Sequence, residues 1–163
     1  MAALSLVTDL VSEHDTLSQL LWRHQEALVA HNWARAARLI ASYRQRLLHC
    51  IYLEEESFLS YCVENGISGR WSNSCISDHR RLDRMLRDVM TDLAVARRRG
   101  VTNQAVVMLI DKEKTMKTLF DRHLQREDEA LVTAFGSTVP DELRDRYERA
   151  HGRMESRKPG RAG

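Results

Sequence analysis

Hydrophobic residues recur along most of this chain at alternating steps of three and four residues. This spacing places them on one face of an α-helix. The pattern predicts four long helices and a short charged one, over about residues 4–31, 33–65, 78–99, 103–135 and 140–149. Short connections between long amphipathic helices are typical of an up-down-up-down four-helix bundle. The predicted fold class is therefore all-α.

Capping residues and glycines set the predicted boundaries. Asn32 and Ser77 are placed to cap the second and third helices, and Arg97-Arg98-Arg99-Gly100 has the basic turn and glycine that end a helix. Residues 66–77 have the composition of a loop. We predict a bundle over residues 1–136, a short C-terminal helix over 137–151 and a disordered basic tail over 152–163.

Composition excludes several classes of protein. With 7 Gly and 2 Pro in 163 residues, the chain has too few turn signals for a small β-sandwich or barrel. It has no apolar run of about 18 residues and no basic, apolar leader, so we expect a cytoplasmic protein without membrane contact. The three cysteines lack CxxC spacing, so we expect reduced thiols. The net charge is +2, but the tail from residue 152 carries +3 and leaves the body of the protein at −1, so nucleic acid is not an expected partner of the folded part.

Polar residues interrupt the apolar stripes at equivalent places. They are His14, Glu54, His79, His123 and Glu127. Burying such a group without a partner costs about 2–7 kcal/mol. His123 and Glu127 lie one helical turn apart on the same face, and antiparallel packing brings all five to one level of the bundle. A shared metal site would satisfy them together.

The two halves of the chain resemble each other as a duplicated helical hairpin. EHDTLSQLL from Glu13 matches DHRRLDRML from Asp78, and LEEESFL from Leu53 matches REDEALV from Arg126. In this register Glu54 corresponds to Glu127. The repetition supports one site built from both halves.

Over about residues 6–135 the sequence resembles the hemerythrin-like, or HHE cation-binding, family. The resemblance is carried by SEHDTLSQLL, HCIYLEEESFL, SDHRRLDRML and RHLQREDEAL. It implies a non-haem di-iron centre in a four-helix bundle, with two iron ions joined by an oxo or hydroxo bridge. The implied metal ligands are His14, Glu54, His79, His123 and Glu127. The implied function is binding or sensing of O2 or NO, or a part in iron or redox homeostasis.

The second helix departs from the family pattern, which has a histidine four residues before Glu54. Cys50 stands at that position, and His49 is rotated from it by about 100° on a regular helix. A π-bulge would let His49 reach the site, the Cys50 thiolate could ligate directly, or the position could stay open or hold water. We favour His49, because imidazole is the commoner iron ligand in such sites.

A second polar layer is predicted away from this site. His24 lies 10 residues beyond His14, about 15 Å along the helix, and Glu113 lies 10 residues before His123 on an antiparallel helix. They should therefore share a level. We predict a buried His24–Glu113 hydrogen bond with Tyr43 nearby.

Two functions remain open at this point. The first is a di-iron protein that binds a small diatomic ligand, with a site surrounded by Leu10, Leu17, Phe58, Leu82 and Phe120. The second is a metal-free helical interaction module with a decayed metal site. No residues are arranged for hydrolysis, so an enzyme is not predicted, although weak oxidase or peroxidase activity of bound iron stays open. The sequence identifies no protein partner.

Overall fold

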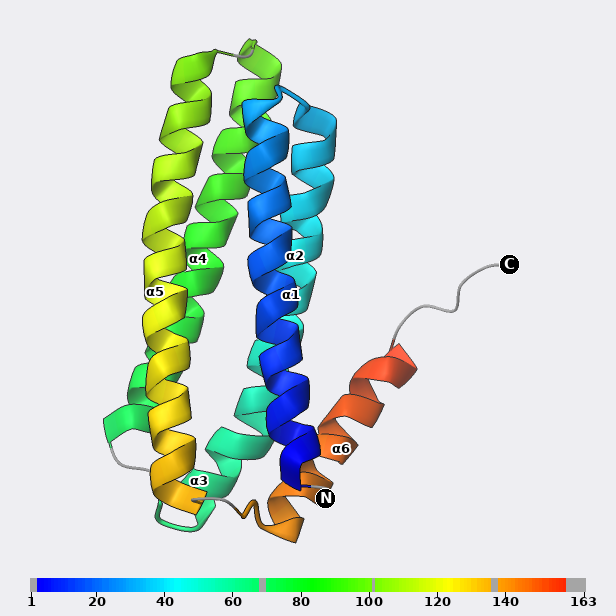
Figure 1. Ribbon diagram of the computed structural model, residues 1–163, viewed down its shortest axis with the longest axis vertical. Helices are drawn as coiled ribbons and strands as arrows, with labels where there is room; N and C mark the ends of the chain where they lie inside the picture. Colours follow the sequence, from blue (N-terminus) through cyan, green and yellow to red (C-terminus); the bar gives the residue numbers. More distant parts are fainter. Residues whose placement is uncertain (1–2, 68–69, 101, 136–137, 158–163) are drawn as a thin grey trace.

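The chain forms a bundle of long helices (Figure 1). The computed structural model describes residues 3–67, 70–100, 102–135 and 138–157. Four helices lie side by side with alternating chain direction: α1 (Ala3–Val29), α2 (Trp33–Leu53), α4 (Arg70–Arg99) and α5 (Asn103–Phe135). The described residues contain no strand, which confirms the predicted all-α class. No helix in this part of the chain combines the length and apolar composition needed to cross a membrane.

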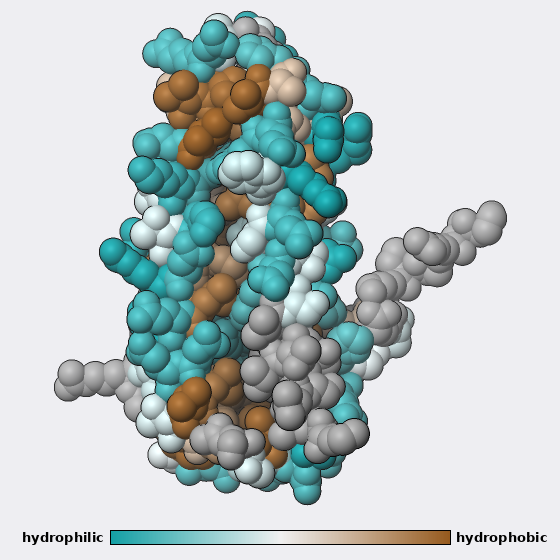
Figure 2. All heavy atoms as spheres, in the orientation of Figure 1, coloured by the Kyte–Doolittle hydropathy of each residue, from teal (hydrophilic) through white to brown (hydrophobic). Residues whose placement is uncertain are grey.

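The core lies along the bundle axis. Leu17, Leu82, Phe58 and Phe120 are buried, as the predicted apolar surroundings of the site require. Within α1 only the side chains from Ser12 onward are described, so the expectation for Leu10 lies outside the described residues. Helix α1 packs mainly on α2, and α4 mainly on α5. Figure 2 shows a largely hydrophilic surface with apolar side chains visible in the seam between α1 and α5.

The turn between α1 and α2 comes slightly earlier than predicted. Helix α1 ends at Val29 rather than near residue 31, and His31 is exposed with φ of 55°. The predicted cap is confirmed, because Asn32 Oδ1 accepts a hydrogen bond from the Arg35 backbone N–H at 3.1 Å. His31 therefore belongs to the turn and not to the face of α1 that packs in the core.

Below Leu53 the second helix changes its winding without ending. A π-helix, η1 (Glu54–Leu59), follows α2 directly and continues into α3 (Ser60–Glu64). A π-helical segment adds residues to a turn and so shifts the inward face. Glu54, Ser57, Phe58 and Leu59 of this segment are all buried. The π-helix thus begins at a candidate ligand.

The predicted loop over residues 66–77 is mostly helical. Helix α4 begins at Arg70, so Ser77 lies inside the helix and does not cap it. The indole ring of Trp71 stacks on Phe58 with ring centroids 5.1 Å apart, and Cys75 is buried. These contacts with η1 favour a helix where the local composition favours a loop.

Helix α4 ends where predicted, at Arg99, and Gly100 has a φ of 95°. An L-residue in this left-handed region costs about 1–2 kcal/mol. We expect Gly100→Ala to lower the free energy of unfolding by this amount. No steric clash adds to the cost, because nothing lies within 4 Å of the added Cβ. In contrast, Gly152→Ala inside α6 should raise it by about 0.5–1 kcal/mol. Urea denaturation measures both, and changes of the same sign would contradict this account.

The C-terminal helix is longer than predicted. Helix α6 runs over Asp141–Arg157, so the expected tail from residue 152 is helical up to Arg157, and residues 158–163 lie outside the described residues. Its buried side chains include Leu143, Tyr147 and Ala150. Burial against the bundle explains why this highly charged segment stays helical.

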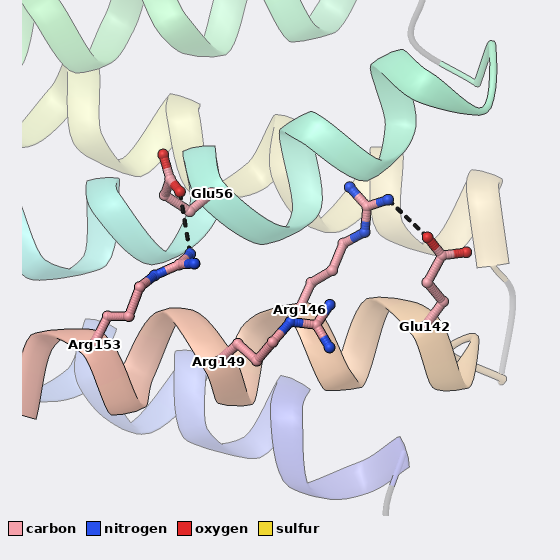
Figure 3. Close-up of a pocket in the computed structure, with 5 residues that line it drawn as sticks. All are labelled: Glu56, Glu142, Arg146, Arg149 and Arg153. Atoms are coloured by element: carbon pink, nitrogen blue, oxygen red, sulfur yellow. Dashed lines mark hydrogen bonds and ion pairs between the residues drawn. The ribbon is translucent and has the colours of Figure 1, made fainter.

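Ion pairs attach α6 to the second-helix region. Arg153 contacts a Glu56 carboxylate oxygen of η1 at 3.2 Å, and Arg146 contacts Glu64 of α3 at 2.6 Å. Arg146 also contacts Glu142 within α6 at 2.7 Å (Figure 3 draws the Glu56 and Glu142 pairs). The Arg146 guanidinium also lies 5.6 Å from the centroid of the Tyr61 ring. Helix α6 therefore covers the outer side of η1, whose inner side carries Glu54.

Candidate metal centre

Five polar side chains from four elements meet inside the lower half of the bundle. Helix α1 supplies His14, η1 supplies Glu54, α4 supplies His79, and α5 supplies His123 and Glu127. All except the partly buried His14 are at least 95% buried. The structure thus brings together the five residues that the resemblance implies as ligands.

One group within this cluster contains Glu54 and two histidines. The Nε2 atom of His79 lies 2.9 Å from Glu54 Oε2 and 3.2 Å from the Nε2 atom of His123. His123 Nε2 lies 3.5 Å from the same carboxylate oxygen. Two ligand atoms on one zinc or iron ion lie at most about 4.2 Å apart, twice a metal–nitrogen bond. The three atoms are therefore close enough to share a cation.

A second group lies against the other oxygen atom of the Glu54 carboxylate. His14 Nε2 lies 3.8 Å from Glu54 Oε1, and Glu127 completes a set whose ligand atoms all lie within 4.8 Å of one another. His14 Nε2 is buried and makes no hydrogen bond with the described residues. A buried nitrogen without a partner fits a ligand atom better than a structural histidine. Glu54 is common to both groups.

A carboxylate on the outer side orients one of the two facing histidines. His79 Nδ1 donates a hydrogen bond to Glu55 Oε1 at 2.9 Å. His123 Nδ1 lies 3.7 Å from Asp78 Oδ2, which is too far for a hydrogen bond, and it has no hydrogen-bond partner among the described residues. Asp78 is itself paired with Arg126, which also donates to Ser74 Oγ at 2.7 Å. A carboxylate that accepts from the outer Nδ1 of a histidine fixes the orientation of the ring, as is usual at metal sites.

The outer carboxylates could not be identified from the sequence pattern. The Glu55 side chain is 42% exposed, yet its carboxylate reaches His79. Asp78 precedes a predicted ligand directly and carried no separate signal. On a regular helix Glu55 would point about 100° away from Glu54. Its contact with His79 therefore becomes visible only in the three-dimensional structure.

Electrostatics inside the cluster separate its two carboxylates. Burial alone would raise the pKa of Glu54, but the three surrounding imidazoles outweigh burial and hold that pKa below its usual range. Burial and the neighbouring Glu54 carboxylate raise the pKa of Glu127 well above its usual range. Burial works against a charged His79, yet its contacts with Glu54 and Glu55 raise its pKa. Without a cation, protons must therefore balance the charge of the cluster.

The structure does not bring His49 to the cluster. Its ring contacts that of His151 on α6, with centroids 5.8 Å apart. The π-helix that would have to rotate His49 inward begins at Glu54, five residues later. His49 is in neither of the two candidate ligand groups, so the structure gives no support to the preference for His49 as a ligand.

Cys50 faces the interior but belongs to neither group. It is 2% exposed and packs within the apolar core. Burial, and after it the nearby Glu54 carboxylate, raises the pKa of its thiol well above the usual range. All three cysteines, including Cys62 and Cys75, are buried and free, as expected for reduced thiols. The position four residues before Glu54, where the hemerythrin-like family has a histidine, is thus occupied by a neutral thiol.

The predicted second polar layer is confirmed. His24 Nε2 lies 2.8 Å from Glu113 Oε1, and both side chains are fully buried. His24 Nδ1 donates to the Ala36 carbonyl oxygen at 2.8 Å, so the pair shares one further proton between Nε2 and the carboxylate. Tyr43 is also buried, and its hydroxyl makes no hydrogen bond with the described residues. Burial is the main cause of its raised pKa, to which Glu113 also contributes.

The chemistry of the cluster fits a cation of intermediate hardness. Imidazole nitrogen together with carboxylate oxygen suits iron, zinc or manganese, whereas the absence of a thiolate disfavours copper(I). His14 Nε2, which has no hydrogen-bond partner among the described residues, and the Nε2 atoms of His79 and His123, which lie 3.2 Å apart, are the nitrogens that a metal would bind. The residues present therefore could hold a metal ion.

Comparisons with protein-family models, with curated proteins and with solved structures found no match for this chain. The fold and the site define a helical bundle with a buried histidine and carboxylate cluster able to bind metal.

Proposed function

We propose that this chain is a hemerythrin-like protein that holds two non-haem iron ions and binds or senses a small diatomic ligand, O2 or NO. The single observation that carries the proposal is the position of Glu54 between two ligand groups, one with His79 and His123 and the other with His14 and Glu127. A carboxylate shared in this way is the natural bridge between two cations.

The two ion positions would have different ligands. His79 and His123 would supply two nitrogens to one ion, whereas His14 would be the only nitrogen ligand of the other. Because His49 faces α6 and Cys50 stays in the core, that second ion would keep an open position. When bound, iron supplies reversible ligand binding or one-electron chemistry, and an open position is what such chemistry requires.

The surroundings of the cluster support small-ligand binding. Phe120 lies edge-on to His14 with ring centroids 5.9 Å apart, and Leu17 and Leu82 are fully buried. An apolar shell limits the entry of water and tunes the redox potential of a metal. The chain's own part is to orient His79 through Glu55 and to exclude water.

Iron content and visible spectroscopy test this proposal. The protein is purified under reducing conditions and reoxidised in air. We expect about two irons per chain, oxo-bridge absorption bands, and a lower melting temperature after chelation. Reduced protein exposed to NO should give a changed spectrum.

A protein without iron whose stability does not respond to chelator would contradict the proposal. That result would favour the metal-free helical interaction module, in which the cluster is held by its own protons and ion pairs. Retention of zinc instead of iron would keep the metal site but exclude O2 or NO as its ligand, because zinc has no redox chemistry.

A further inference from the structure

A groove of about 400 Å³ lies between α4 and α5. Its rim carries Arg81 of α4 and Lys114 and Arg122 of α5, all exposed. Met85 and Leu119 lie lower in it, partly buried against the main core. The groove therefore combines a cationic rim with an apolar floor.

The cations of this groove have no ion-pair partner among the described residues. Other basic residues of the same two helices are paired, for example Lys112 with Asp92 and Lys117 with Asp121. Asp111 is the one carboxylate in the described lining of the groove, and it is not within ion-pair distance of the rim cations. The charge of the rim is thus largely uncompensated.

The basic surface continues onto the neighbouring face of α4. A shallow recess of about 440 Å³ there is lined by Arg80, Arg84 and Ile76, among others. Neither arginine makes an ion pair within the described part of the chain, and both are exposed. Like charges gathered on one face repel, so an anionic partner would lower the free energy of this surface.

The pocket between α6 and η1 differs in this respect. It measures about 230 Å³ and also contains arginines, but Arg146 and Arg153 are already paired with carboxylates (Figure 3). Two of these pairs, Arg146 with Glu64 and Arg153 with Glu56, join α6 to α3 and η1. A ligand there would have to break them, whereas a ligand in the α4–α5 groove would not.

We propose that the α4–α5 groove is a docking surface for an acidic amphipathic helix of another protein. Lys114 and Arg122 are eight residues apart, about 12 Å along α5, which matches carboxylates two turns apart on the partner. Apolar side chains between those carboxylates would cover Met85 and Leu119, as in other helix-in-groove complexes. The apolar floor favours a protein partner over a nucleic acid, whose phosphates would leave it uncovered. The inference does not depend on the metal.

A synthetic peptide tests the docking surface directly. The probe is an 18-residue helical peptide with Glu residues two turns apart and Leu between them, labelled for fluorescence anisotropy and titrated with the full chain. We expect saturable binding that weakens with salt. Arg81→Glu with Arg122→Glu should weaken it at least about tenfold. Lys114→Glu, nine residues from His123, should weaken it in the same direction without disturbing the cluster.

Two controls separate docking from general charge attraction. Arg35→Glu with Arg38→Glu reverses exposed cations of α2, which also lack ion pairs with the described residues, and should leave the affinity within about twofold. A peptide with Ala in place of Leu should bind weakly. The proposal would be overturned if the peptide did not bind, or if the α2 variant lost as much affinity as the groove variants. It would also be overturned if a single-stranded oligonucleotide bound as tightly as the peptide and the groove substitutions abolished that binding. Far-UV circular dichroism confirms that each variant is folded.

Discussion

Glu54→Gln is expected to remove metal from the protein almost completely. Glu54 offers one carboxylate oxygen to the His79 and His123 group and the other to the His14 group. A carboxamide has the same shape, but its NH2 group cannot bind a cation and its charge is lost. We therefore expect both ions to be lost together, measured as iron per chain after purification in parallel with the unaltered protein.

Glu56→Gln is the matched control for this substitution. It lies in the same π-helix, two residues away, but its carboxylate faces Arg153 on the outer side (Figure 3). We expect its metal content to equal that of the unaltered protein. Glu127→Gln should give an intermediate value, because Glu127 belongs to only one of the two groups. Equal losses from Glu54→Gln and Glu56→Gln would show that metal retention does not depend on the cluster.

Glu113→Leu is expected to destabilise the protein more than any other single change proposed for the second polar layer. It would leave His24 Nε2 fully buried without a partner. Removing one member of a buried charged pair costs about 3–5 kcal/mol. The free energy of unfolding, measured in urea on metal-free protein, should fall by this amount. Glu113→Gln should cost much less, since the amide can donate to Nε2 while His24 Nδ1 still donates to Ala36.

The double variant His24→Leu with Glu113→Leu isolates the interaction. Replacing both members of a buried polar pair by apolar groups can be nearly neutral, so we expect the double variant to be more stable than Glu113→Leu alone. Glu129→Leu, an exposed position on the same helix, should change stability by less than about 0.5 kcal/mol. Additive losses in the double variant would contradict a direct His24–Glu113 interaction.

The contrast between His24 and His49 shows which inferences the sequence supports. The pairing of His24 with Glu113 follows from the fixed rise of a helix and the antiparallel order, so it could be predicted and is confirmed. The position of His49 depends on where the π-helix begins. The carboxylate run at Glu54–Glu56 gives no local signal for the start of the π-helix, whose residues contact α6 and, through Phe58 and Trp71, α4.

The start of α4 and the end of α6 illustrate the same limit. Glycine, serine and asparagine before Ser77 favour a loop locally, yet Trp71 stacks on Phe58 and the helix begins at Arg70. Likewise α6 reaches Arg157, and Tyr147 and Ala150 are buried on its way. In both cases burial of side chains against η1 and its neighbours outweighs modest helix propensity.

The sequence by itself determined the all-α class, the order of the helices, and the level at which His14, Glu54, His79, His123 and Glu127 meet. These follow from the helical repeat, which is a property of the backbone and hardly depends on context. Only the tertiary structure decided that Glu54 lies between two ligand groups, that Glu55 orients His79, and that the His49 ring lies against His151 of α6. Those features depend on side-chain directions and on one π-helix, which contacts between elements distant in the sequence select.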